Sequence, residues 1–230
     1  EPGARVAIML PNIPQFAVTM AAVLRAGYTC VNVNPLYTAR ELEHQLKDSG
    51  ASAIIILENF AHTLEQVISR TAVRHVALTA MGDLLGGAYG QWITFAVRNL
   101  AKMVPPFKLP LDQGRSVICW PDAIAAGRAR KLEPSGSTLD SVAFLQYTGG
   151  TTGLSKGAVL THRNIVAATL QAEAWFTPAL ERAGDLSKVN SIAALPLYHI
   201  FALTLCLLAI RQGSHLTLIP NPRDMRKFVG

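Results

Sequence analysis

Hydrophobic residues in the first 81 positions form short apolar runs, which alternate with longer segments whose apolar positions recur every three or four residues. The runs are rich in aliphatic and β-branched side chains, as expected of strands covered on both faces of a sheet. Alternation of such strands with helices predicts an α/β fold, with β-sheets flanked by helices. The four runs are Val6–Leu10, Cys30–Val33, Ile54–Leu57 and His75–Leu78.

One of the intervening helices has recognisable sequence signals at both ends. Thr38 and Glu41 have the spacing of a capping box, in which each side chain accepts a backbone N–H of the other residue. Tyr37 and Leu42 occupy the positions of a hydrophobic staple, and Gly50 is placed to end the helix. These signals predict a helix that begins after Thr38 and stops before Gly50.

Glycine and proline residues interrupt this alternation between positions 82 and 140, and we expect it to resume only near Val142. Within the interruption, apolar residues recur at helical spacing over Gln91–Lys108, a segment with three basic residues and no acidic one. That combination is typical of an amphipathic helix at a membrane surface. The alternative is a helix that packs on the sheet and turns its basic residues to solvent.

A second apolar stretch, Ile192–Ile210, contains nineteen residues without a formal charge and is long enough to be tested as a membrane span. Pro196 near its start favours a different division. We expect a buried strand over Ser191–Leu195, a turn at the proline, and a buried helix that runs to Arg211 and stops at Gly213.

The segment with the clearest chemistry lies at residues 147–157, where four glycines, four hydroxyl side chains and Lys156 stand together. Glycines let backbone N–H groups turn toward an anion, and hydroxyls and a lysine add donors and charge. An apolar strand, Val142–Leu145, leads into it, and a helix begins near Thr161. The pattern predicts a phosphate-binding loop between a strand and a helix.

Two other nucleotide-binding motifs are excluded. A Walker loop needs a Ser or Thr after its lysine, whereas Gly157 follows Lys156. No G-x-G-x-x-G follows the first strand, so a dinucleotide site is not supported. A flexible turn rich in glycine and threonine is the remaining alternative.

The distribution of charge narrows the class of ligand, and the cysteine spacing narrows the kinds of cross-link that the chain could form. The net charge is +6, of which residues 141–230 contribute +4, from eight basic and four acidic residues. The basic residues are dispersed, which favours a small anionic ligand over nucleic acid. Cys30, Cys119 and Cys206 lie far apart without C-x-x-C spacing, so we expect buried small apolar side chains rather than disulfides or a zinc site.

Residues 147–157 resemble the signature Y-T-S-G-T-T-G-x-P-K-G of the adenylate-forming superfamily, which includes acyl-CoA synthetases, luciferases and peptide-synthetase adenylation domains. Gly149 replaces its commonest serine, and Ser155 its proline, which removes a fixed φ and loosens the loop. Residues 31–38, 160–164 and 194–201 are similar to bacterial long-chain fatty-acid–CoA ligases.

The resemblance implies that residues 1–230 form an incomplete N-terminal adenylating domain, with the C-terminal domain absent and no turnover by this segment alone. Its parts are α/β units at 1–81, an irregular excursion with an amphipathic helix at 82–140, and the phosphate loop and acyl-site segment at 141–230. The implied reaction activates a fatty acid with ATP and Mg²⁺ and transfers it to coenzyme A. Alternatives are another acyl- or aryl-adenylating enzyme, or a non-catalytic phosphate-binding module.

Site residues are also implied by the resemblance. Lys156 is the catalytic cation, and His199 helps gate the acyl carboxylate, beside Tyr198 and Phe201 at the substrate. From sequence alone a helix-cap role is favoured for His199, and no metal ligand set is found. The ATP phosphates are assigned to Tyr147, Thr148, Gly149, Gly150, Thr151, Thr152, Gly153, Leu154, Ser155, Lys156, Gly157 and Ala158.

The same resemblance implies a cytoplasmic enzyme whose substrate is a long-chain fatty acid and which has no nucleic-acid partner. Because that substrate is poorly soluble in water, we expect peripheral contact with the inner face of a membrane through residues 91–108. A homodimer is compatible with this picture.

Overall fold

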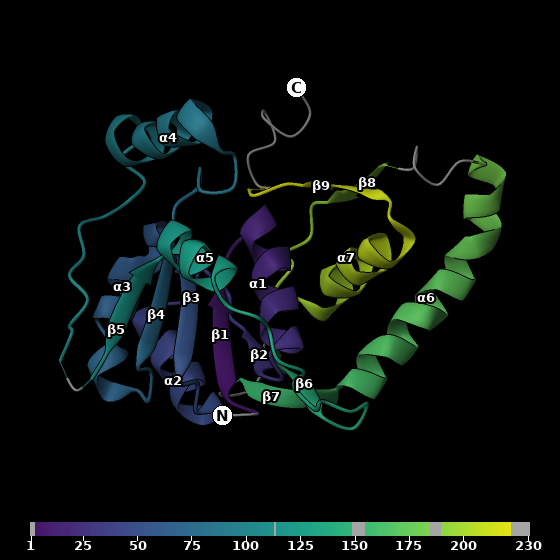
Figure 1. Cartoon of the computed structure of the whole chain (residues 1–230), viewed down its shortest axis with the longest axis horizontal. Helices are drawn as coiled ribbons and strands as arrows, with labels where there is room; N and C mark the ends of the chain where they lie inside the picture. The colour runs from purple at the N-terminus through teal and green to yellow at the C-terminus, as the bar shows by residue number, and fades with distance from the viewer. Residues whose placement is uncertain (1–2, 113, 149–154, 185–189, 222–230) are drawn as a thin grey trace.

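The computed structural model describes residues 3–112, 114–148, 155–184 and 190–221. Seven strands form one sheet in the order β5-β4-β3-β1-β2-β6-β7, in which all neighbours are parallel except the antiparallel pair β6 and β7 (Figure 1). The four predicted strands are confirmed as β1 to β4. The strands are β1 (Arg5–Met9), β2 (Thr29–Asn32), β3 (Ala53–Leu57), β4 (His75–Thr79), β5 (Ser116–Cys119), β6 (Val142–Thr148) and β7 (Lys156–Thr161).

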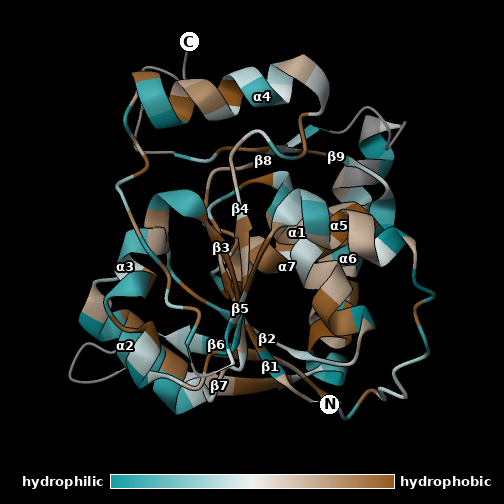
Figure 2. Cartoon of the chain, turned by 60° about the vertical axis from the view of Figure 1, so that its left-hand side comes forward, coloured by the Kyte–Doolittle hydropathy of each residue, from teal (hydrophilic) through white to brown (hydrophobic). Residues whose placement is uncertain are grey.

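Helices cover both faces of this sheet because successive strand residues point to opposite sides. Val6 and Ile8 of β1 pack in a cluster with α1 (Pro14–Arg25) and α7 (Ile200–Gln212). Ala7 and Met9 join the opposite cluster, with α2 (Ala39–Ser49) and α3 (Ala61–Glu65). Figure 2 shows the hydrophobic strands between these helices. Short 3-10 turns at Glu58–Phe60 and Ile68–Arg70 flank α3.

The helix signals in α2 are confirmed. Both hydrogen bonds of the Thr38–Glu41 capping box are present, and Gly50 ends the helix in the left-handed conformation with φ 62°. Leu42 and Leu46 are fully buried against the sheet. The α2 helix is therefore fixed at both ends and along one face.

The segment 82–140 is more regular than predicted. Strand β5 pairs with β4 in parallel, and α5 (Trp120–Arg128) follows it, so the α/β alternation resumes at Ser116 rather than near Val142. Cys119 lies exposed on this edge strand, which corrects the expectation that all three cysteines are buried.

The helix predicted for Gln91–Lys108 begins earlier and ends earlier than expected. It consists of α4 (Gly87–Phe95) and a π-helical turn at Ala96–Leu100. Lys102 then has φ 50°, and Pro105 and Pro106 cannot continue a helix. The α4 helix lies beyond the sheet, away from α1 and α2 (Figure 1).

The C-terminal part places a second, two-stranded parallel sheet beside the first. It pairs β8 (Asn190–Ala193) with β9 (His215–Leu218), and α7 connects the two strands. The division of Ile192–Ile210 into strand, turn and helix is confirmed, with Gly213 ending α7. The prediction that the strand is buried is wrong, because β8 ends at Ala193 and only that residue of it is buried. Among the described residues, no helix is both long and apolar enough to cross a membrane. The long helix α6 (His162–Ala183) packs beside α7 (Figure 1).

A close backbone crossing holds the start of α4 to the loop after β4. A Cβ built on Gly82 would overlap the carbonyl oxygen of Gly90, whereas one on Gly127 in α5 would meet nothing within 4 Å. We expect Gly82→Ala to lower the free energy of unfolding and to speed proteolysis near α4. The control Gly127→Ala should raise that free energy by up to about 1 kcal/mol, because alanine is the better helix former. Equal stability of the two variants in chemical denaturation would contradict this packing.

Candidate functional site

The predicted phosphate loop joins two strands of the large sheet. Strands β6 and β7 pair so that Tyr147 faces Gly157 and Thr148 faces Lys156. The loop residues Gly149–Leu154 lie outside the described residues. The predicted helix start at Thr161 is confirmed, but the loop does not lie between a strand and a helix, because β7 stands between the loop and α6. Thr161 and Asn164 form the capping box of that helix.

Tyr147 anchors the loop rather than presenting a free hydroxyl. Its ring is buried, and its Oη donates a hydrogen bond to Asp48 Oδ2 at 2.5 Å. Burial and the neighbouring Asp48 carboxylate raise the pKa of Tyr147 above its usual value. Gly157 lies against the ring, and a Cβ there would approach it to 3.0 Å. The glycine thus serves close packing of the tyrosine.

Thr148 and Lys156 lie at the open end of the hairpin. As cross-strand partners their side chains share one face of the sheet, and both residues are exposed. Lys156 has no ion-pair partner in the part of the chain that the structure describes. A hydroxyl and an unpaired ammonium therefore face solvent together, as an anion site requires.

Tyr198, His199 and Phe201 lie at the turn into α7. His199 is the N-cap residue of this helix, but its side chain makes no capping hydrogen bond. Its exposed ring lies 4.6 Å from the ring of Tyr198, and Phe201 is 62% exposed. The helix-cap position of His199 is confirmed. Its imidazole makes no capping hydrogen bond, so both ring nitrogens are left for other contacts.

Buried amide side chains bring the two segments together. Gln146, one residue before Tyr147, donates from Nε2 to the carbonyl oxygen of Tyr198 at 2.8 Å. Asn32 Nδ2 in turn donates to Gln146 Oε1 at 3.0 Å. The end of β6 is thereby tied to the backbone beside His199, although the two lie more than fifty residues apart in sequence.

Asn12 fixes the strand end that leads to Tyr198. Its Nδ2 donates to the carbonyl oxygens of Ala193 and Leu195, each at 2.9 Å, and its Oδ1 accepts the Leu197 N–H at 2.8 Å. Neither Asn12, Asn32 nor Gln146 was predicted as a site residue. A polar residue within a buried apolar run, or one or two residues after its end, is the sequence feature that marks all three.

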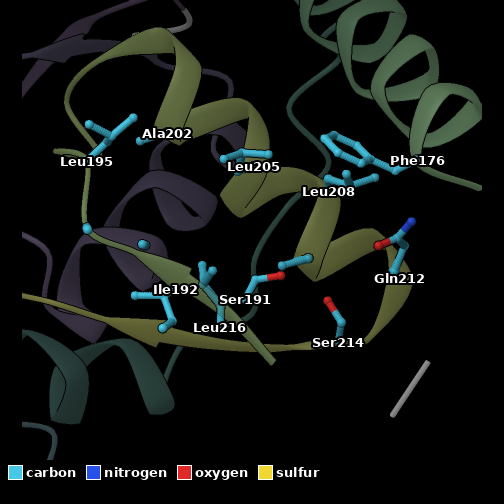
Figure 3. A pocket seen from close by; sticks show the side chains of 13 residues that line it. Phe176, Ser191, Ile192, Leu195, Ala202, Leu205, Leu208, Gln212, Ser214 and Leu216 are labelled. Carbon is cyan, nitrogen blue, oxygen red and sulfur yellow. The ribbon is translucent and has the colours of Figure 1, made fainter. Parts of the chain in front are cut away.

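An apolar pocket of about 190 Å³ lies between α6, α7 and the β8–β9 sheet (Figure 3). Leu205 and Leu208 of α7 and Phe176 of α6 line one side, and Ile192 and Leu216 the other. Ala202, three residues after His199, also lines it. Its lining suits an aliphatic or aromatic group better than a polar one.

The described residues contain no group of three or more histidine, cysteine, aspartate or glutamate side chains that could hold a metal ion. Near the hairpin, the carboxylate of Asp48 already accepts the Tyr147 hydroxyl. Hydroxyl groups such as that of Thr148 are weak metal ligands by themselves, so these residues do not form a resident metal site.

A family model and individual related proteins all match nearly the whole chain. The family model described as AMP-binding enzyme matches residues 1–229. A long-chain-fatty-acid–CoA ligase of Yersinia pestis is 50% identical over 230 residues, which are all of this chain and 39% of that protein. The corresponding ligase of Haemophilus influenzae is 47% identical over 229 residues, which are 99% of this chain and 39% of the relative. The chain thus spans about two fifths of the length of these relatives.

Solved structures show the same fold at lower identity. A long-chain-fatty-acid–CoA ligase from Archaeoglobus fulgidus superposes with a TM-score of 0.66 at 23% identity, covering 96% of this chain and 36% of that one. An anthranilate CoA ligase in complex with anthranoyl-AMP gives a TM-score of 0.70 at 20% identity, with the same coverage. At these identities the likeness concerns the fold alone.

Removal of the Asn12 amide would leave the buried Leu197 N–H without its partner and would take one hydrogen bond from each of the Ala193 and Leu195 carbonyl oxygens, of which the first still accepts the Ile219 N–H. An unsatisfied buried group costs about 1–3 kcal/mol, so we expect Asn12→Ala to lower the free energy of unfolding by about that amount. Asn99→Ala is the matched control, because the exposed Asn99 donates only to the Phe95 carbonyl within its own helix. Comparable losses in the two variants by urea denaturation would contradict the role given to Asn12.

Proposed function

The chain belongs to the AMP-binding enzyme family, and we propose that the polypeptide containing it is a long-chain fatty-acid–CoA ligase. The observation that carries this proposal is 50% identity over the whole chain to a ligase of that name. The geometry is compatible with it, because Gln146 joins the phosphate-loop hairpin to Tyr198.

The proposed reaction has two steps. A carboxylate oxygen of the fatty acid attacks the α-phosphorus of ATP, and pyrophosphate leaves. The thiol of coenzyme A then attacks the carbonyl carbon of the acyl-adenylate, loses its proton and expels AMP. The first step brings two anions together and builds charge on the leaving group, so positioning and charge neutralisation must carry it. Mg²⁺ bound to the ATP phosphates would supply part of that neutralisation.

In this proposal the hairpin end binds the β- and γ-phosphates. The Lys156 ammonium is exposed and unpaired within the described residues, and it would neutralise the leaving pyrophosphate. Thr148 would donate its hydroxyl to a phosphate oxygen from the neighbouring strand. The remaining donors are the backbone N–H groups and hydroxyls assigned to residues 149–155 by the resemblance.

The acyl group is proposed to approach along α7. The exposed His199 imidazole stands at the helix start, where it would orient the carboxylate rather than exchange a proton with it. The apolar pocket beside Ala202 supports a hydrocarbon substrate, since its lining is mainly leucine and alanine, with one isoleucine and one phenylalanine (Figure 3). An aryl acid is the alternative, and comparison of oleate with 4-coumarate as substrate separates the two.

We expect Lys156→Ala to reduce the rate of fatty-acid-dependent ATP–pyrophosphate exchange in the full polypeptide by about 10²–10³-fold. That is the usual effect of losing one preorganised group that stabilises developing charge. Lys131→Ala, which removes an exposed lysine after α5, serves as the charge-matched control. A wild-type exchange rate in the Lys156 variant would refute the role of this lysine. Absence of oleate-dependent exchange in the unmodified enzyme would refute the substrate.

Peripheral membrane contact is proposed to occur through α4 and the residues after it. Large apolar side chains there are exposed, among them Trp92 at 54%, Phe95 at 49% and Leu100 at 63%. No acidic residue occurs between Asp83 and Asp112. Arg98 contributes less to this surface than the sequence suggested, because its Nη2 pairs with the buried Glu58 carboxylate at 2.7 Å.

Removing the exposed aromatic rings should therefore weaken vesicle binding without disturbing that ion pair. For Trp92→Ser combined with Phe95→Ser, we expect at least a roughly tenfold fall in partitioning onto phosphatidylglycerol vesicles, since even partial burial of two rings is worth more than about 1.4 kcal/mol. Trp175→Ser is the control, because Trp175 is 82% exposed but lies on α6. Equal binding of both variants in sedimentation assays would exclude α4 as the contact.

A further inference from the structure

We propose that one face of α2, formed by His44 and Asp48, is a collar that positions both ends of the phosphate loop. This inference rests on the proposed function and adds two positioning residues to it. The loop residues 149–154 lie outside the described part of the chain, so the inference uses only the residues on either side of them. Neither His44 nor Asp48 is implied by the family signature that identified the loop.

Asp48 holds the incoming end of the loop. Its Oδ2 accepts the Tyr147 hydroxyl at 2.5 Å, from a helix 99 residues earlier in the sequence. The Tyr147 ring is confined on its other side by Gly157, the cross-strand partner of Tyr147. Because the tyrosine is held at both its hydroxyl and its ring, the backbone of Thr148 has little freedom to move.

His44 holds the outgoing end. It lies one helical turn before Asp48, on the same face of α2. Its Nε2 lies 3.1 Å from the carbonyl oxygen of Ser155, so the nitrogen donates to it. His44 thus restrains the residue that directly precedes Lys156.

Helix α2 is itself fixed against the large sheet, so it can restrain Tyr147 and Ser155. Its capping box and terminal Gly50 fix the two ends, and Gln45 Nε2 donates to the Asn32 carbonyl oxygen at 2.8 Å. Backbone N–H groups that bind phosphate act best when they are held in place before the ligand arrives. Ser155 has no ring to fix its φ, and the hydrogen bond from His44 supplies the missing restraint.

The test uses paired substitutions in the full polypeptide, assayed by ATP–pyrophosphate exchange and by thermal unfolding. Asp48→Ala and His44→Phe remove the hydrogen-bonding groups, whereas Asp48→Asn keeps an acceptor and His44→Gln keeps a donor. We expect the first two to lower kcat/KM for ATP by about 10–100-fold at an unchanged melting temperature, since small misplacements of binding groups have effects of this size. The two conservative variants should retain activity, as should Lys47→Ala, whose ion pair with Glu43 does not involve the loop.

A rescue experiment separates positioning from simple packing. If His44 acts by restraining position 155, then Ser155→Pro, which fixes φ there, should restore most of the activity lost in His44→Phe. Failure of the proline to restore activity, equal losses in conservative and disruptive variants, or losses that follow the melting temperature would each overturn the collar.

ATP binding measured by calorimetry on the same variants distinguishes this inference from the proposed function. If the unmodified enzyme binds ATP but shows no exchange with oleate, the substrate assignment fails while the collar is still tested by ATP affinity, which should fall in Asp48→Ala and His44→Phe. If oleate-dependent exchange is present and these variants match the unmodified enzyme in both assays, the collar alone is wrong.

Discussion

The site depends above all on the hydrogen bonds of the buried Asn12 amide. Asn12 follows the central strand β1, and its three bonds to Ala193, Leu195 and Leu197 connect the first βα unit to a segment more than 180 residues later. Neither sheet makes this connection through its own strand pairing, since β8 and β9 pair only with each other among the described strands. The asparagine therefore sets where the turn carrying Tyr198 and His199 lies relative to the large sheet.

The hairpin of β6 and β7 combines two requirements at one edge of that sheet. Its first strand must pair in parallel with β2 and bury Phe144, whereas its end must leave Thr148 and Lys156 in solvent. The residues between these extremes, Gln146 and Tyr147, carry the cross-links to Tyr198 and to α2. The buried residues of β6 thus hold its exposed last residue, Thr148, in a fixed place at the edge of the sheet.

The α4 segment is attached differently, through a few polar contacts and one backbone crossing. Arg98 pairs with Glu58, Asn59 Nδ2 donates to the Met103 carbonyl oxygen at 3.0 Å, and Gly82 lies against Gly90. These contacts hold the segment while its aromatic side chains remain exposed. Removing Arg98 would leave the Glu58 carboxylate buried without its partner. The main role of Arg98 is therefore to hold α4 to the rest of the protein, and it adds little positive charge to the exposed surface.

Local patterns determined much of the architecture: strands β1 to β4, the capped helix α2 and the strand–turn–helix around Pro196 all follow from burial periodicity and end signals. The sequence also predicts a phosphate loop at residues 147–157, because its glycines, hydroxyls and lysine are contiguous. Only the tertiary structure decided that β7 lies between the loop and α6, that Arg98 is paired, and that Asn12, Asn32, Gln146, His44 and Asp48 support the site. The physical reason is distance along the chain: a capping box or an apolar run is complete within a few residues, whereas a hydrogen bond between residues 99 or 185 positions apart exists only once the sheet has brought them together.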